Sequence, residues 1–188
     1  SRDILHQVIK DLDLQTEYRK KDGLRWMGQY PHRDLTVVYP HMFLDTTTTG
    51  AKIEIKARKN DYLVKVKRKR FQTSTHRVKD LTQPFNTCVG DIHFVLNKQL
   101  EKGDCYKLWT MPKLSAINAY KTWITAAPLK KESNIITITT TTDMPRRAID
   151  FITKEIELYN LDALVDKNIM ATNTASFIDE RLKLIEME

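Results

Sequence analysis

Histidine and cysteine side chains are the first candidates for metal binding, because imidazole and thiolate groups ligate transition metals. Neither Cys88 nor Cys105 has a second cysteine or a histidine at metal-ligand spacing, so they are two free thiols or one disulfide in an oxidising compartment. The histidines are scattered without such spacing. They are His6, His32, His41, His76 and His93. We therefore expect no metal site and no cofactor.

The motifs of the common enzyme classes are also missing. The sequence contains no GxxxxGKS/T phosphate loop, no GxGxxG, no HExxH and no GxSxG elbow. It has only five glycines, which argues against an anion cradle built from backbone. The acidic residues mostly alternate with Lys and Arg on helix faces, as solvated charge does. We therefore expect no catalytic residue and interpret the chain as a non-enzyme.

Basic residues outnumber acidic ones, 31 to 24, and the net charge is +7. The positive charge is concentrated in residues 65–70, with smaller groups at residues 19–21 and 130–131. Such a surface could bind nucleic acid or lie near anionic lipid headgroups, or it could be a solvated strand end and two loops. No recognisable nucleic-acid motif accompanies the charge. We expect no nucleic-acid partner, and keep a basic α+β nucleic-acid-binding module as the alternative function.

The elements that must position these side chains form one domain, or one domain with an appendage, since the chain has 188 residues of which 41% are hydrophobic. No run approaches the roughly 18 apolar residues of a membrane span. Residues 51–58 and 62–71 alternate with a period of two and predict a hairpin with one wet face. Further strands are expected at 35–38, 91–96 and 134–142, helices at 1–14 and 112–124, and loop or irregular structure at 18–33 and 78–86. This order predicts an α+β fold, in which a small mixed β-sheet packs with helices on one face and a long C-terminal helix projects from that base.

The long helix is expected to start at Asp143, which can cap it, with Pro145 in the first turn. No glycine or proline follows Pro145, and residues 177–188 are still amphipathic where the sequence stops. We expect that the chain was cut from a larger protein. The alternative is two helices with a break near residues 173–174, because residues 172–174 are weak helix formers.

Two apolar stripes run along this helix. The first is Ile149, Ile152, Ile156, Tyr159 and Ala163, and we expect it to lie on the sheet. The second has heptad spacing and is formed by Leu164, Asn168, Ala171, Ala175, Ile178, Leu182 and Ile185. The change of stripe predicts a base domain at residues 1–163 and the start of a projecting helical arm at 164–188. The arm should fray or pair with another molecule, with Leu164, Ala171, Ala175, Ile178, Leu182 and Ile185 as oligomer contacts.

Three segments together resemble a known family. The first is Arg2-Asp3-Ile4-Leu5 with Asp11-Leu12-Asp13-Leu14 and Tyr18, and the second is Asp143-Met144-Pro145-Arg146-Arg147-Ala148. The most specific is Tyr159-Asn160, then Asp166-Lys167, then Asn173-Thr174-Ala175-Ser176-Phe177-Ile178-Asp179-Glu180-Arg181-Leu182. In this order they resemble the extracytoplasmic domain of polysaccharide chain-length determinant proteins, or polysaccharide co-polymerases. The chain most resembles the subgroup whose members are fused to, or partnered with, a cytoplasmic tyrosine kinase for capsular or exopolysaccharide export.

The resemblance implies a bacterial inner-membrane protein whose periplasmic region has an α/β base near the membrane and long projecting helices. Family members assemble into rings and govern polymer length or export. The implied partners are further copies of the chain, the polysaccharide polymerase and export machinery, and the inner membrane through segments absent from this sequence. The return of the helical hairpin and the kinase portion are also missing, so no family catalytic residue can be carried over. Whether the parent protein carries its own kinase domain stays open.

Overall fold

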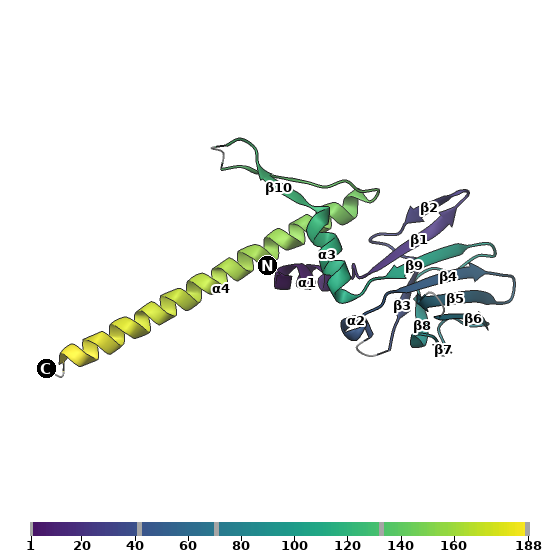
Figure 1. Ribbon diagram of the computed structural model, residues 1–188, viewed down its shortest axis with the longest axis horizontal. Coiled ribbons are helices and arrows are strands. Elements are labelled where there is room, and N and C mark those ends of the chain that lie inside the picture. Colours follow the sequence, from purple (N-terminus) through teal and green to yellow (C-terminus); the bar gives the residue numbers. More distant parts are fainter. Residues whose placement is uncertain (1, 41–42, 70–71, 132–133, 187–188) are drawn as a thin grey trace.

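The computed structural model describes residues 2–40, 43–69, 72–131 and 134–186, with side chains up to Lys183. Two β-sheets face each other to form the body, and the helices gather beyond one end of the sheets (Figure 1). The α+β class that the sequence predicts is confirmed. We had expected the helices to cover one face of the sheet, and this expectation is wrong. A second sheet covers that face instead.

The larger sheet has six strands in the order β2-β1-β9-β4-β5-β6, and each ladder between neighbours is antiparallel. The strands are β1 (Thr16–Asp22), β2 (Arg25–Gly28), β4 (Ala51–Ala57), β5 (Tyr62–Lys69), β6 (Gln72–Val78) and β9 (Cys105–Thr110). Alternation along β4 explains its orientation, because Ile53 and Ile55 are fully buried whereas Lys52 and Glu54 are exposed. The β4–β5 hairpin therefore has one wet face, as predicted.

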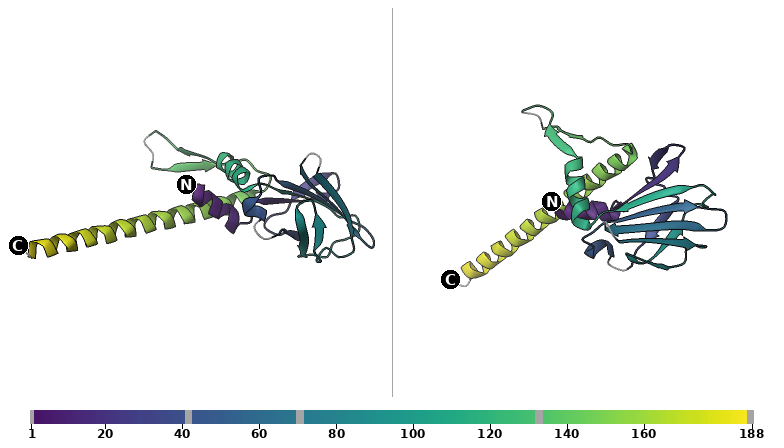
Figure 2. Two further views of the ribbon diagram at one scale, coloured as in Figure 1. Left: turned by 60° about the horizontal axis from the view of Figure 1, so that its bottom comes forward. Right: turned by 45° about the vertical axis from the view of Figure 1, so that its right-hand side comes forward.

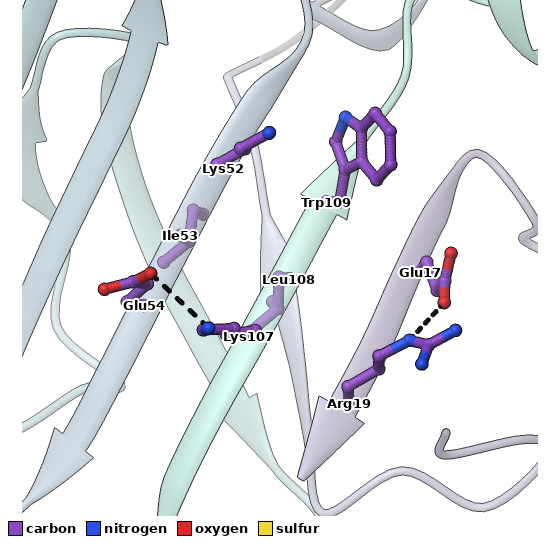
Figure 3. A pocket seen from close by; sticks show the side chains of 8 residues that line it. All are labelled: Glu17, Arg19, Lys52, Ile53, Glu54, Lys107, Leu108 and Trp109. Atoms are coloured by element: carbon purple, nitrogen blue, oxygen red, sulfur yellow. Dashed lines mark hydrogen bonds and ion pairs between the residues drawn. The ribbon is translucent and has the colours of Figure 1, made fainter. Parts of the chain in front are cut away.

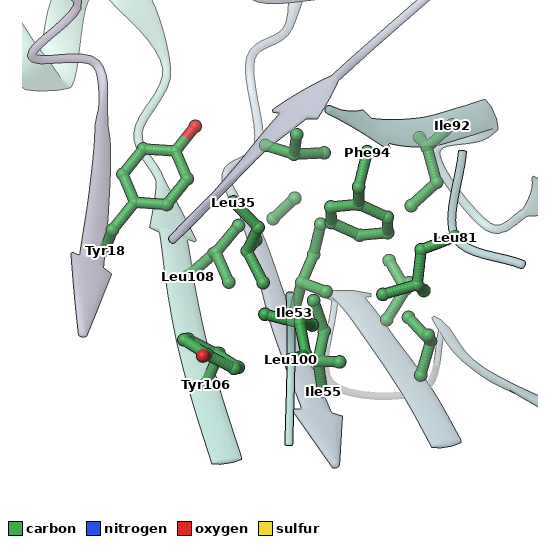
Figure 4. Close-up of a cluster of buried hydrophobic side chains, with 14 of the residues drawn as sticks. Tyr18, Leu35, Ile53, Ile55, Leu81, Ile92, Phe94, Leu100, Tyr106 and Leu108 are labelled. Carbon is green, nitrogen blue, oxygen red and sulfur yellow. The ribbon is translucent and has the colours of Figure 1, made fainter. Parts of the chain in front are cut away.

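The smaller sheet covers the inner face of the larger one. It has the order β3-β8-β7, with β3 at Leu35–Val38, β7 at Phe85–Thr87 and β8 at Gly90–Leu96. Leu35 and Phe94 from this sheet meet Ile53, Ile55 and Leu108 of the larger sheet in one core, shown in Figure 4. Gly50, just before β4, lies so close to β9 that a Cβ atom there would be 2.5 Å from the carbonyl oxygen of a β9 residue.

A second, separate core holds the helices together. It joins α1 (Arg2–Asp11), α3 (Lys113–Trp123) and the first turns of α4 (Pro145–Glu186). Phe151 of α4 is fully buried, its ring stacks on Tyr120 with centroids 5.1 Å apart, and it meets the edge of Trp123 at 5.5 Å. An ion pair of 3.4 Å between Lys154 and Asp11 adds a polar contact between α4 and α1.

The first predicted stripe of α4 is wrong in both its members and its partner. Phe151 packs in the helical core, Ala148 is buried three residues before it, and the partners of this part of α4 are α1 and α3 rather than a sheet. Ile149, Ile156 and Tyr159 are 57%, 47% and 64% exposed. The buried face lies one position before the predicted stripe, because the Phe151 ring packs between Tyr120 and Trp123 of α3.

The whole of α4 is one continuous helix of 42 residues, about 63 Å long at 1.5 Å per residue. It extends far beyond the body in each view (Figure 2). The alternative of a break near residues 173–174 is wrong. Thr172 and Thr174 donate their hydroxyl groups to the carbonyl oxygens of Asn168 and Met170, at 2.9 and 2.8 Å, so these weak helix formers keep their polar groups paired within the helix.

Several of the observed elements were not predicted from the sequence. Residues 18–33, expected as loop, contain the end of β1 and all of β2, and β9 was missed entirely. The predicted strand at 134–142 is the short β11 (Ile136–Thr139), which pairs with β10 (Thr125–Pro128) in a two-stranded hairpin away from the sheets. A short helix, α2 (Phe43–Thr46), precedes β4. None of the described helices is both long enough and apolar enough to cross a membrane.

Candidate functional site

The outer face of the six-stranded sheet collects most of the clustered charge. The antiparallel register places every second residue of each strand on this face, opposite the core. Its basic side chains are Arg19, Lys21, Lys52, Lys56, Lys65, Lys67, Arg77 and Lys107, and its acidic ones are Glu17 and Glu54. No helix covers this face in the views of Figure 2. We call this surface the outer sheet face.

The structure divides the basic runs that the sequence singles out. Lys65 and Lys67 lie on the outer sheet face, whereas Arg68 points inward and its guanidinium lies 5.8 Å from the centre of the Phe43 ring. Arg70 lies outside the described residues. Lys130 and Lys131 are exposed at the distal end of the β10–β11 hairpin, well away from the sheets (Figure 1). The clustered positive charge therefore lies on a sheet face and on a separate loop, not on a strand end and two loops.

Two tryptophans on the outer sheet face each lie beside a lysine. The ammonium nitrogen of Lys107 is 4.3 Å from the ring centre of Trp26, and that of Lys52 is 4.9 Å from the ring centre of Trp109. Cation–π attraction fixes each indole next to a positive charge. Trp109 remains 51% exposed, so half of its surface is open to a ligand.

A hollow of about 340 Å³ lies between β1, β9 and β4 on this face. Figure 3 shows its lining side chains, with Glu17 and Arg19 on one side, Lys52 and Glu54 on the other, and Trp109 at one end. Arg19 donates to Glu17 at 2.5 Å, and the Lys107 ammonium is 4.0 Å from the Glu54 carboxylate. The hollow thus offers cationic donors, carboxylate acceptors and an indole ring together.

Most lysines of the outer sheet face are not neutralised by neighbouring acids. Among the described residues, no carboxylate lies within 4.0 Å of the ammonium of Lys21, Lys52, Lys56, Lys65 or Lys67. Exposed ammonium groups on adjacent strands repel each other and create a positive potential. An anionic ligand would relieve this repulsion on binding.

A network of polar side chains supports the edge of this face from inside. Lys20, between Arg19 and Lys21 in β1, points inward, and its ammonium lies 3.1 Å from carboxylate oxygens of both Asp34 and Asp104. The hydroxyl of Tyr106 donates to Asp34 at 2.8 Å and also contacts Asp104 at 3.1 Å. These contacts join β1, the start of β3 and the start of β9.

The network changes the proton affinities of its members. Burial alone would raise the pKa of Asp34 and of Asp104, but hydrogen bonds and the nearby Lys20 charge outweigh it and lower both. The pKa of Tyr106 is raised by burial and by the two carboxylates, so its hydroxyl stays protonated as a donor. Every group of the network has a partner, and we assign it to holding the strands in place rather than to chemistry.

The predicted oligomer contacts lie along an exposed length of α4. Leu164, Ile178 and Leu182 are 55%, 50% and 53% exposed, and Ala171 and Ala175 are exposed too. The side chain of Ile185 lies outside the described residues. Other apolar side chains, including Val165, Ile169 and Phe177, are exposed on other sides of the helix. From residue 164 to 183 the helix therefore has no cover from its own chain.

The cysteines are free thiols, and both are only partly buried. His6 lies in α1, His32 between β2 and β3, His76 in β6 and His93 in β8, and His41 is outside the described residues. Across the described part of the chain, no three His, Cys, Asp or Glu side chains are grouped so as to hold a metal ion.

Sequence reasoning missed the two tryptophans and Lys107. The segment Cys105–Thr110 carries the signal that would have found two of them, because Tyr106, Leu108 and Thr110 alternate with Lys107 and Trp109.

No protein-family model matches the sequence, and no curated protein matches it.

Proposed function

We propose that the chain is a non-catalytic periplasmic domain of a polysaccharide co-polymerase anchored in the bacterial inner membrane. It acts by oligomeric assembly and so controls the chain length or export of a capsular or exopolysaccharide. Its partners are further copies of itself, the polysaccharide polymerase and export machinery, and the membrane through other parts of the protein.

The observation that carries this proposal is the exposed length of α4, called the arm here and covering residues 164–183. A single helix in water gains little stability from its backbone alone, and most helices are stabilised by packing an apolar face. The arm has apolar side chains at heptad spacing, with Leu164, Ile178 and Leu182 each at least half exposed. Such a helix is completed by another helix.

The helical core supports the same proposal, because it fixes the direction in which the arm leaves the body. Phe151 is buried in the core that α4 forms with α1 and α3, and Lys154 pairs with Asp11 of α1 about one turn later. The arm is thus the continuation of a firmly packed helix. Arms held at a constant angle can build a closed, symmetric assembly, which flexible tails cannot.

The test is the molar mass of the complete protein in detergent, measured by light scattering after gel filtration. The expected result is a discrete homo-oligomer that dissociates when Ile178→Asp and Leu182→Asp are combined. Ile169→Asp is the matched control, since nine residues at 3.6 per turn place Ile169 on the opposite side of α4 from Ile178. A complete protein that stays monomeric would refute the proposal.

A second candidate is the basic α+β nucleic-acid-binding module, and the outer sheet face favours it. Lysines interleaved with Trp26 and Trp109 on an open antiparallel sheet are a surface on which bases could stack and phosphates bind. Binding of this kind weakens steeply as salt rises. A filter-binding assay with single-stranded DNA that shows no affinity at low salt would exclude it.

A further inference from the structure

The outer sheet face combines features that no contact within the chain explains. Within the described part of the chain, all of its lysines except Lys107 lack an acidic partner, Lys52 and Lys107 lie against indole rings, and the hollow beside Trp109 has no side chain filling it. From β2 to β5 the face spans four strand spacings, about 19 Å at 4.8 Å each. This width suits a segment of a polymer rather than a single small molecule.

We infer that the outer sheet face binds a segment of an acidic polysaccharide whose sugar units carry carboxylates. The two tryptophan–lysine pairs, Trp26 with Lys107 and Trp109 with Lys52, are its central contacts. Lys107 and Trp109 are two residues apart on β9, so the two pairs follow each other at about 7 Å along that strand.

Each pair matches the chemistry of a uronic acid unit. The C–H face of a sugar ring is apolar and packs on an indole ring, and the ring carboxylate accepts a charge-assisted hydrogen bond from an ammonium group. The cation–π contact keeps the ammonium and the indole side by side, so one sugar unit can reach both. Lys65 and Lys67 on β5 extend the positive surface beyond the two pairs.

Glu17 and Glu54 favour a polysaccharide over a nucleic acid. Both line the hollow among the basic side chains, within 4.0 Å of Arg19 and Lys107 respectively. Sugar hydroxyl groups donate hydrogen bonds to carboxylates, whereas the phosphodiester backbone of DNA has no hydroxyl donor for them. The mixed charge therefore fits a hydroxyl-rich polymer whose sugar units also carry carboxylates.

The inference that the ligand is a polysaccharide rests on the proposed function and extends it. The position of the site is inferred from the sheet alone. The two can therefore fail separately. Loss of oligomer assembly concerns the arm on α4, and loss of polymer binding concerns the outer sheet face at the other end of the molecule (Figure 1).

The experiment measures equilibrium binding of the chain to three fluorescent probes at one fixed ionic strength. The probes are an oligogalacturonate, its fully methyl-esterified form, and an oligothymidylate. The variants are Trp109→Ala and Lys52→Gln, with the double variant of Lys130→Gln and Lys131→Gln as the control that removes charge elsewhere. Circular dichroism verifies that each variant is folded, as expected for exposed positions.

The expected result is that the oligogalacturonate binds, its methyl ester does not, and each site variant binds about tenfold more weakly, a change of about 1.4 kcal/mol. The control double variant should bind like the unaltered protein. No oligogalacturonate binding, or equal losses in the site and control variants, would overturn the inference while leaving the assembly proposal intact. Tighter binding of the oligothymidylate that depends on Trp109 would overturn it in favour of a nucleic-acid site.

Discussion

The packing of Phe151 gives the sharpest test of how α4 is attached to the body. Its side chain is fully buried, and it contacts Tyr120 and Trp123 with ring centroids 5.1 and 5.5 Å away. Replacing it with alanine removes these contacts and leaves a cavity, and such substitutions cost about 3–5 kcal/mol. Because native domains are stable by only about 5–15 kcal/mol, this is a large fraction of the total.

Urea unfolding followed by circular dichroism measures this loss. With a urea dependence of about 2 kcal/mol per molar, a loss of 4 kcal/mol lowers the unfolding midpoint by about 2 M. Phe177→Ala is the matched control, because it makes the same substitution on the same helix at a ring that is 59% exposed. Its effect should stay within about 0.5 kcal/mol. Equal effects of the two substitutions would refute the docking of α4 through Phe151.

Three further predictions concern other parts of the fold. Because Asp34 and Asp104 have a lowered pKa in the folded state, they stabilise the protein above their ordinary pKa of about 3.9 and lose this contribution as pH falls through the folded values; unfolding free energy should therefore fall as pH drops below about 4, and Asp34→Asn should flatten that fall. Gly50→Ala should lower the melting temperature by several degrees, since its Cβ would clash with the carbonyl oxygen of Thr110, and an unchanged melting curve would contradict this contact. Burial raises the pKa of Glu155, so ionising it disfavours folding as pH rises above its ordinary pKa of about 4.3; Glu155→Gln should therefore increase stability at pH 7 but not at pH 3, as measured by urea unfolding.

The parts of the fold that the sequence predicts well are those with one clear periodicity. Alternation in β4 and β5 is regular because one face of the hairpin is wet and the other is core. The long helix is equally clear, since it has a proline in its first turn and no later glycine or proline. Local pattern and tertiary packing agree in both cases, so neither one overrides the other.

The part of the outer sheet face that β1, β2 and β9 form was missed, because β1 and β2 look like polar loops. The segment β1 is rich in charge, and β2 is only four residues long and ends in Gly28, so neither shows a long apolar alternation. Only the pairing of β1 with both β2 and β9 brings Trp26 beside Lys107, and the paired residues of β1 and β9 are 86 to 94 positions apart. Single-sequence periodicity carries no information about that contact.

The stripe on α4 was misassigned for a different reason. Apolar residues surround the first turns of this helix, so several registers are plausible from spacing alone. The choice depends on the partner, and the core formed by α1 and α3 accepts the face that contains Phe151. The face with the predicted stripe is also partly covered, because Ile156 and Tyr159 line a groove together with Ile138 of the β10–β11 hairpin.

The most direct test of the proposed function is the length distribution of the polysaccharide made by the organism that encodes this chain. Its gene is replaced by the unaltered form, by the form with Ile178→Asp and Leu182→Asp, or by the control Ile169→Asp, and the polymer is compared by gel electrophoresis. The expected result is an altered length distribution or reduced export with the arm variant alone. Deletion of the gene that leaves polymer length and amount unchanged would contradict the proposed function.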